Sequence, residues 1–260
     1  MIPPYSGPLL FEIGPVSVAL FGALVATGVM VGHEVAVRLA EKRGVPGSVI
    51  RNAAACAVLA GFFGAHLFDV VFYRPEKFSR DGFLVFLKVW DGISSFGGFF
   101  GAIAGVATYF ARRGKSWWTE ADCLMQGLVV GWLFGRLGCT LTSDHPGRLS
   151  DFALAFAYSD GARHNLGFYE FAYTALVLLP AMLWLGARER RDGYRPGVYV
   201  AAMAALYAPA RFAMDFLRAT DIAKADPRYL GLTAGQYFAL MVVAGAIFML
   251  GRLRRARPSG

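Results

Sequence analysis

The sequence predicts an all-α integral membrane protein, with about seven transmembrane helices and a small extracytoplasmic head formed by loops. Apolar residues make up 56% of the 260 residues and charged residues only 17%, and the mean hydropathy is +0.46. A soluble domain of this length would need more polar surface. Apolar runs of membrane-crossing length recur along the chain, and basic residues gather in alternate loops. We therefore expect residues 1–260 to form a single transmembrane domain.

The amino-terminal segment enters the first apolar run without a basic residue. "MIPPYSGPLLFEIGPVSVALFGALV" contains no Lys or Arg, and the first cation is Arg38. A secretory signal peptide needs a positive stretch ahead of its apolar core. We therefore expect this segment to stay in the mature protein as the first span.

Seven segments are long and apolar enough, or nearly so, to cross a bilayer as helices. A helix of about 20 mostly apolar residues crosses the ~30 Å hydrocarbon core. The third segment is short and rich in glycine ("FGGFFGAIAG"), and its small residues at helical spacing indicate close helix packing. The predicted spans are residues 16–37, 52–73, 95–111, 120–139, 167–187, 196–217 and 234–251.

The Lys and Arg residues of the loops predict the orientation of these spans. One set of loops, together with the carboxyl tail, holds 15 of them, and the alternate set holds nine. Because cytoplasmic loops carry the excess of basic residues, we expect the amino terminus outside and the carboxyl terminus in the cytoplasm. The formal charge of +8 is then an orientation signal, and we expect no nucleic-acid partner.

Two further cations, Arg136 and Arg211, lie inside predicted spans. Arg136 is 13 residues beyond Cys123, about 20 Å along a helix, and Arg211 is 15 residues beyond Pro196, about 22 Å. Both then lie in the outer third of the membrane, where a charge costs at least ~2.5 kcal/mol and usually faces a partner or a cavity. Guanidinium groups suit phosphate, so the sequence predicts an anion site. The alternative is structural: Arg211 pairs with Asp215 four residues on, and Arg136 reaches to the interface.

Polar residues gather at the predicted outer ends of the same spans. Arg211, Asp215 and Arg218 form one stripe at helical spacing. A lone His or Glu at such a place can equally be a solvated interface residue. The other polar groups that converge on this face are Asp144, His145 and Arg148 with Gly147 between the spans, and Arg163, His164, Tyr169 and Glu170 at the start of the fifth span.

Motifs for metals, nucleotides and common hydrolases are missing from the sequence. Cys56, Cys123 and Cys139 lie in or beside apolar runs and give neither a disulfide framework nor a metal-ligand spacing. There is no phosphate-binding glycine loop with its Lys, no Gly-x-Ser-x-Gly elbow and no His-Glu-x-x-His helix. We expect neither a metal nor a cofactor.

Six short segments together carry a family resemblance. In chain order they are "FEIGPVSVALFG", "VWDGISSFGG", "GRLGCTLTSDHPGR", "RHNLGFYE", "YAPARFAMDFLR" and "LGLTAGQ". Each is a modest signal alone, but in this order they resemble prolipoprotein diacylglyceryl transferases, which are seven-span enzymes of the bacterial cytoplasmic (inner) membrane.

The resemblance implies that a diacylglyceryl group is transferred from phosphatidylglycerol to the lipobox cysteine thiol of a preprolipoprotein. The implied partners are phosphatidylglycerol, the preprolipoprotein signal peptide and membrane lipids. A thiolate attacks the glycerol carbon that bears the phosphate, so cations must hold the phosphate and a base must take the thiol proton. The implied catalytic residues are His164, Arg136, Arg211 and Glu170. The implied residues for the phospholipid phosphate and headgroup are Arg136, Arg211, Asp144, Gly147, Arg148, Asp215 and Arg218.

The chain departs from the family pattern at several positions. Phe96 stands where the family has a histidine, Cys139 where it commonly has an asparagine, and Asp215 where it has a glutamate. Since phenylalanine cannot abstract a proton, His164 becomes the first choice for the base.

Two other functional classes compete with the transferase. The loss of histidine at Phe96 favours a non-catalytic paralogue that binds anionic phospholipid or lipoprotein. A small-solute transporter is disfavoured, because the polar groups gather at one face and not along a path through the midplane. The retained Arg136, Arg211 and His164 lead us to expect the transferase.

Overall fold

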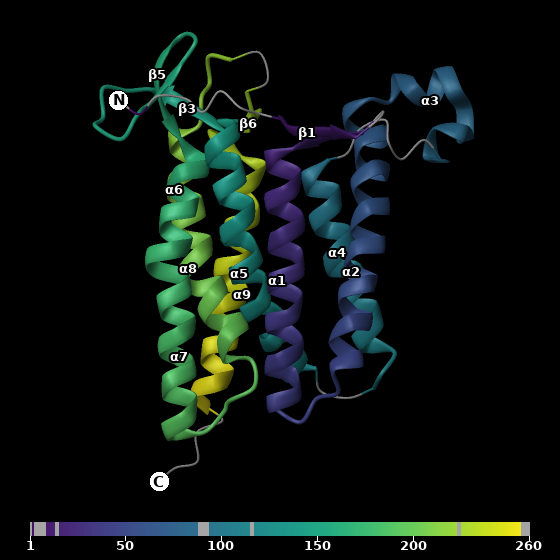
Figure 1. The fold of residues 1–260 in the computed structure, drawn as a ribbon, viewed down its shortest axis with the longest axis vertical. Coiled ribbons are helices and arrows are strands. Elements are labelled where there is room, and N and C mark those ends of the chain that lie inside the picture. The colour runs from purple at the N-terminus through teal and green to yellow at the C-terminus, as the bar shows by residue number, and fades with distance from the viewer. Residues whose placement is uncertain are drawn as a thin grey trace. The chain divides into compact units, whose positions relative to one another are not determined.

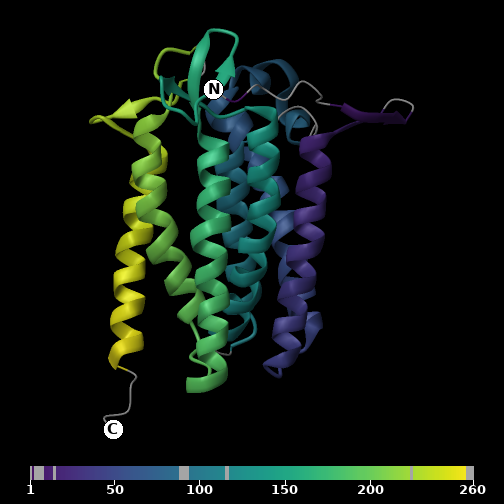
Figure 2. The same ribbon diagram turned by 60° about the vertical axis from the view of Figure 1, so that its left-hand side comes forward.

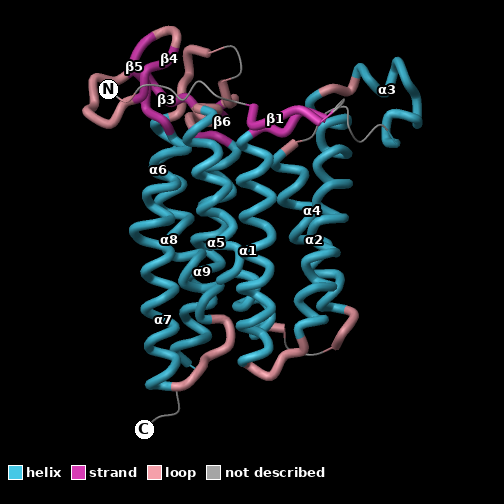
Figure 3. Tube along the Cα trace, in the orientation of Figure 1, coloured by secondary structure: helices cyan, strands magenta, loops and turns pink. Residues whose placement is uncertain are grey.

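The computed structural model describes residues 2, 9–13, 16–87, 94–114, 117–222 and 225–255. It divides into two compact units, the first made of Met1–Ala36 and Ala121–Gly260 and the second of Val37–Glu120. Helices dominate the chain (Figures 1 and 3). Within these described ranges, six helices are long and apolar enough to cross a membrane, and Gly97–Ala111 forms a shorter apolar helix. The predicted helical, multi-pass membrane fold is confirmed.

The helices follow the predicted spans closely. In chain order they are α1 (Leu20–Lys42), α2 (Gly47–Phe68), the π-helical turn η1 (Asp69–Tyr73), α3 (Glu76–Asp81), the 3₁₀ turn η2 (Gly82–Leu87), α4 (Ser95–Ala111), α5 (Trp118–Thr142), α6 (Leu166–Tyr173), the π-helical turn η3 (Thr174–Leu178), α7 (Leu179–Asp192), α8 (Val198–Met214), the 3₁₀ turn η4 (Asp215–Leu217) and α9 (Ala234–Arg255). The helices α6 and α7 are continuous through η3, so Leu166–Asp192 is one span.

Short strands lie at one end of the helices of the first unit, and the carboxyl end of α9 lies at the other (Figures 1 and 2). β3 (Pro146–Leu149), β4 (Phe156–Tyr158) and β5 (Gly161–Asn165) form an antiparallel sheet in the order β3-β5-β4. Two further antiparallel pairs join β1 (Leu9–Ile13) to β2 (Val16–Ala19), and β6 (Arg228–Tyr229) to β7 (Leu232–Thr233). The predicted head of loops therefore contains sheet.

The start of the first predicted span is wrong. Residues 16–19 form strand β2, and α1 begins only at Leu20. Two of these four residues, Val16 and Val18, are β-branched, a type that fits an extended, paired backbone well. Apolar character alone did not distinguish this strand from the helix that follows it.

Glycines allow α1 and α5 of the first unit to cross in close contact. A Cβ at Gly32 would lie 2.5 Å from the carbonyl oxygen of Gly127, and a Cβ at Gly127 would lie 2.3 Å from the carbonyl oxygen of Gly32. Such contacts exclude any side chain, which is the packing mode of small residues in membranes. In the second unit, Gly101 and Gly105 of α4 approach the backbone of α2 in the same way, so the predicted packing role of the glycine-rich span is confirmed.

A buried carboxylate fixes the start of α8 against α5. Asp122 Oδ2 accepts hydrogen bonds from the hydroxyl of Tyr194 at 2.9 Å and from the amide of Gly197 at 2.7 Å. Its Oδ1 accepts from the amides of Tyr199 at 3.0 Å and Val200 at 2.9 Å. These amides belong to the first turn of α8, where no intrahelical acceptor exists. A side chain of α5 thus caps α8.

Candidate functional site

Glu170 of α6 joins the two membrane arginines. Its carboxylate is buried. Arg136 Nε of α5 lies 3.0 Å from Oε2, and Arg211 Nη1 of α8 lies 3.5 Å from Oε1. The hydroxyl of Tyr207 donates to Oε2 at 2.9 Å. Two cations predicted at one depth therefore meet at a single anion that three helices surround.

Asp215 extends this cluster toward the end of α8. Its Oδ1 lies 2.9 Å from Arg211 Nη2 and 2.6 Å from Arg218 Nε, and the hydroxyl of Thr233 donates to its other oxygen. Arg218 also pairs with Asp226. The pairing of Arg211 with Asp215, which the structural alternative required, is present together with the pairing to Glu170.

The ion-pair cluster is the set Arg136, Glu170, Arg211, Asp215, Arg218 and Asp226. Its three guanidinium and three carboxylate groups balance in formal charge. The cluster still offers donors: the side chains of Arg136 and Arg211 are 15% and 17% exposed. Although Arg211 Nη1 lies within ion-pair distance of Glu170, it makes no hydrogen bond to any described residue. A buried donor of this kind is costly unless another acceptor reaches it.

Arg136 is held on α5 by its neighbours in the helix. Its guanidinium lies over the ring of Trp132, 4.4 Å from the ring centroid, and its Nη1 lies 3.9 Å from Cys139 Sγ. A cation over an aromatic face is stabilised by the ring quadrupole, more so where water is scarce. These contacts position the Arg136 guanidinium toward Glu170.

Arg163 of β5 anchors the β3-β5-β4 sheet to neighbouring segments. This buried side chain donates to the carbonyl of Gly147 at 3.0 Å and binds both oxygens of Asp160 and of Asp221. Hydrogen bonds from Arg163 lower the pKa of Asp160 and of Asp221 below their usual values. Arg163 is therefore a structural clamp between β3, β5 and the segment after α8.

Gly147 lies where the sheet meets the end of α8. A Cβ there would lie 2.7 Å from the Leu217 carbonyl oxygen and 2.9 Å from that of His164. Gly147 also forms an antiparallel bridge with Arg218. Its predicted contact with substrate is untested, but the close backbone contacts give glycine a packing reason. Arg148 is exposed on β3.

His164 leads from β5 into α6. Its Nδ1 lies 2.7 Å from the hydroxyl of Tyr169, and the next residue, Asn165, caps α6 by accepting from the Phe168 amide. Burial lowers the pKa of His164 below its usual value, which favours the neutral ring. Among the described residues, no hydrogen bond or ion pair joins His164 to Arg136 or Arg211.

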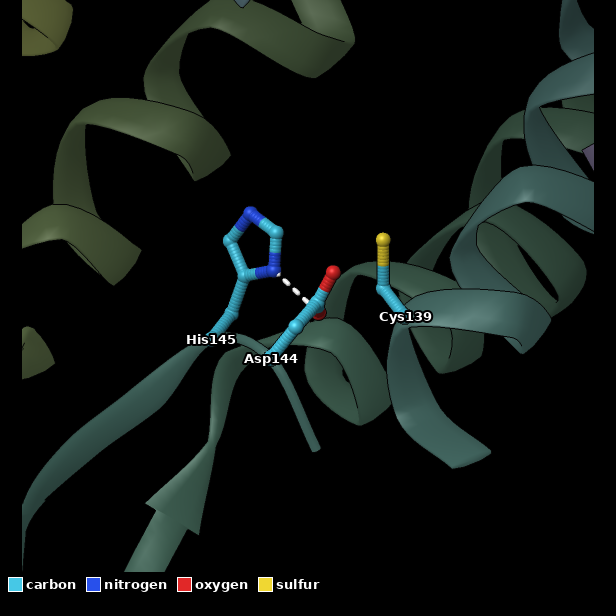
Figure 4. A group of neighbouring side chains, drawn as sticks. All are labelled: Cys139, Asp144 and His145. Atoms are coloured by element: carbon cyan, nitrogen blue, oxygen red, sulfur yellow. Dashed lines mark hydrogen bonds and ion pairs between the residues drawn. The ribbon is translucent and has the colours of Figure 1, made fainter. Parts of the chain in front are cut away.

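Asp144 and His145 form a second polar group beyond the end of α5. Asp144 Oδ1 lies 2.5 Å from His145 Nδ1, and a ligand atom of each side chain lies within 4.8 Å of Cys139 Sγ (Figure 4). The backbone at Ser143 is left-handed, with φ of 52°. This turn folds the chain back toward the last turn of α5, a proximity that the sequence analysis did not predict.

Several further residues of the site were missed in the sequence. Tyr207 lies four residues before Arg211 and Trp132 four before Arg136, a spacing that places each on the same helical face and could have identified both. Thr233 and Asp226 reach the cluster only through the tertiary fold. Phe96 belongs to α4, and its side chain lies outside the described residues.

Comparisons with known proteins point to one family. A model of the family described as prolipoprotein diacylglyceryl transferase matches residues 8–252. Proteins named phosphatidylglycerol–prolipoprotein diacylglyceryl transferase are similar to this chain: 29% identical in Vibrio cholerae and 30% in Vibrio parahaemolyticus, each over 97% of this chain and 93% of the relative. Another, from Janthinobacterium, is 31% identical over 78% of this chain and 76% of the relative.

Proposed function

Because the chain belongs to the prolipoprotein diacylglyceryl transferase family, we propose that it transfers a diacylglyceryl group from phosphatidylglycerol to the lipobox cysteine of a preprolipoprotein. The relatives are named for this reaction. The thiolate sulfur bonds to the glycerol carbon, the bond from that carbon to the phosphate oxygen breaks, and glycerol phosphate leaves with the electron pair.

The observation that carries the proposal is the meeting of Arg136 and Arg211 on Glu170. Two guanidinium groups that converge on one carboxylate can equally converge on a phosphate, whose charge grows as the leaving group departs. Arg211 Nη1, which makes no hydrogen bond to any described residue, is a ready donor for it. The phosphate would compete with Glu170, which would become the alternative partner of both arginines.

The other roles are assigned by position. Asp215 would orient Arg211 and Arg218 for the headgroup. Asp144, Gly147 and Arg148, at the turn after α5 and on β3, would border the headgroup and glycerol.

We assign the general base to His164. With Nδ1–H donating to the Tyr169 hydroxyl oxygen, Nε2 is left as the acceptor for the thiol proton. The lowered pKa keeps this nitrogen unprotonated near neutral pH.

We further propose a bacterial cytoplasmic (inner) membrane location with the amino terminus outside and the carboxyl terminus in the cytoplasm. The distribution of Lys and Arg among the loops supports this orientation. The end of the first unit that carries β3–β5 would then face outward, where the signal peptide of the preprolipoprotein presents its cysteine.

Transfer to a lipobox peptide by the purified protein in phosphatidylglycerol vesicles tests the proposal. Arg136→Gln and Arg211→Gln should each lower the rate and weaken phospholipid binding, whereas Arg113→Gln, on an exposed residue after α4, should change neither. Arg→Lys should restore only part of the activity, because an ammonium cannot form the same paired hydrogen bonds. Phospholipid binding without transfer by the wild type would contradict the enzyme and leave a lipid-binding relative.

A further inference from the structure

Three different metal-binding side chains meet at the outward end of α5. Cys139 Sγ, a carboxylate oxygen of Asp144 and a ring nitrogen of His145 all lie within 4.8 Å of one another. The view in Figure 4 shows the sulfur, the carboxylate and the Nδ1 side of the imidazole around a common space. Such a set is chemically unlike a cluster of acidic residues, since it offers a sulfur, a nitrogen and an oxygen.

We propose that Cys139, Asp144 and His145 form a binding site for a divalent transition metal of the zinc class. Thiolate and imidazole ligands favour Zn²⁺ over Mg²⁺ and Ca²⁺, which take oxygen ligands. Three protein ligands leave a fourth tetrahedral position open, as in zinc sites that bind water or substrate. Binding of the metal can be tested without measuring transferase activity.

The geometry requires only a small adjustment. Ligand atoms of tetrahedral zinc lie about 3.5 Å apart, given bonds of ~2.0–2.3 Å. The 4.8 Å limit of the present set therefore closes with side-chain shifts of about 1 Å. The hydrogen bond between Asp144 and His145 must open, because the ion replaces the proton between Oδ1 and Nδ1.

Charge and access also fit the ion. A Cys139 thiolate and an Asp144 carboxylate neutralise Zn²⁺, so Arg136, 3.9 Å from the sulfur, would face a complex without net charge. The thiol proton leaves to solvent, and the proton on Nδ1 of His145 moves to Nε2. The side chains of His145 and Asp144 are 29% and 39% exposed, so an ion can enter past them to the buried sulfur.

The backbone holds the three donors in place. Ser143 adopts a left-handed conformation, with φ of 52°, which costs about 1–2 kcal/mol in a residue with a side chain. Its amide bonds the carbonyl of Thr140 at 3.3 Å. This turn ends α5 and brings Asp144 and His145 back over Cys139. The backbone conformation at Ser143 therefore sets the approach of these two residues to the thiol.

Co²⁺ replaces Zn²⁺ as the probe, in the full-length tag-free protein in detergent. We expect one Co²⁺ per chain with a thiolate-to-cobalt charge-transfer absorption, displaced by Zn²⁺. Cys139→Ser should abolish the absorption, and Asp144→Asn and His145→Gln should each weaken Co²⁺ binding at least ~10-fold. The control Cys56→Ser, which changes a half-buried thiol of α2, should leave the charge-transfer absorption and the Co²⁺ affinity unchanged.

Asp144→Asn and His145→Gln keep the test decisive if Cys139→Ser fails to fold, because both positions lie in the loop after α5. Wild-type protein that shows no charge-transfer absorption with equimolar Co²⁺ would overturn the proposal. So would absorption that survives in Cys139→Ser, or wild-type affinity in both Asp144→Asn and His145→Gln. Since phospholipid transfer is not the readout, failure here leaves the proposed enzyme untouched.

Discussion

Glu170 is the single counter-ion that Arg136 and Arg211 share, and its removal should affect stability and lipid response in opposite directions. Glu170→Gln removes the carboxylate partner of Arg136 and one of the two carboxylate partners of Arg211, and breaking a buried pair typically costs about 3–5 kcal/mol. The change to an amide also removes the carboxylate that competes with the lipid phosphate for Arg136 and Arg211. We expect a lower unfolding temperature in neutral detergent, and a larger rise in that temperature on adding phosphatidylglycerol than in the wild type.

Asp192→Asn is the matched control for this change. Asp192 forms an exposed pair with Arg188 at the end of α7, and such pairs contribute little to stability. Equal responses of Glu170→Gln and Asp192→Asn to phosphatidylglycerol would show that Glu170 does not compete with the lipid phosphate.

His164 gives a prediction in the pH dependence of transfer. A general base works unprotonated, and burial lowers the pKa of His164 below its usual value. The rate, measured as kcat/KM, should therefore hold through neutral pH and be lost only as the pH falls through a value below ~6.5. His164→Gln should lower the rate by ~10²–10⁴ and remove this acid limb, while phospholipid binding persists.

His33→Gln serves as the histidine control, because His33 belongs to α1, which contributes no residue to the ion-pair cluster. An unchanged acid limb in His164→Gln would assign the base to another group.

At the scale of elements, the cap of α8 by Asp122 is the contact with the sharpest consequence. Its two oxygens accept four hydrogen bonds. Asp122→Ala should destabilise the protein by about 2–4 kcal/mol, since a cap and charged hydrogen bonds are lost together. Asp122→Asn keeps one accepting oxygen, so its stability should lie between those of the wild type and Asp122→Ala. Thermal unfolding in detergent measures both, and equal stability of the three proteins would contradict the capping role.

The length of the apolar runs was enough to predict the helices, because a span must satisfy its own backbone in the membrane. The predicted third span, 95–111, has the bounds of α4. Strand β2 was missed because four residues, three of them apolar, next to a helix are too few to show a distinct pattern. Asp122 was missed because the amides that donate to it, at the start of α8, are 75 to 78 residues away in sequence.

The site shows the same division between local and distant information. Helix rise placed Arg136 and Arg211 at one depth, and the fold brings them to one carboxylate. That Glu170 is this carboxylate could not be derived from spacing, because it depends on how α6 packs between the other two helices. The approach of Asp144 to Cys139 depends on a backbone conformation at Ser143, which glycine usually adopts.

At the scale of the whole molecule, the topology can be tested directly. Reporter fusions after Arg113 and after Arg255 should both give cytoplasmic signals, because both follow segments rich in Arg. A fusion within the β4–β5 turn, at Asp160, should report from outside. A cytoplasmic signal at Asp160 would reverse the orientation and place the proposed site on the wrong side for an exported substrate.

One helix, α5, carries functions at three heights: Asp122 near its start, the glycine crossing at Gly127 in the middle, and Arg136 near its end. A helix advances 1.5 Å and turns about 100° with each residue. The residue spacing along α5 therefore sets both the height and the direction of each of these groups. One residue added between Gly127 and Arg136 would rotate the Arg136 guanidinium away from Glu170, while the Asp122 cap and the glycine crossing stayed in place. The spacing from Gly127 to Arg136 is therefore as much a part of the site as the residues that line it.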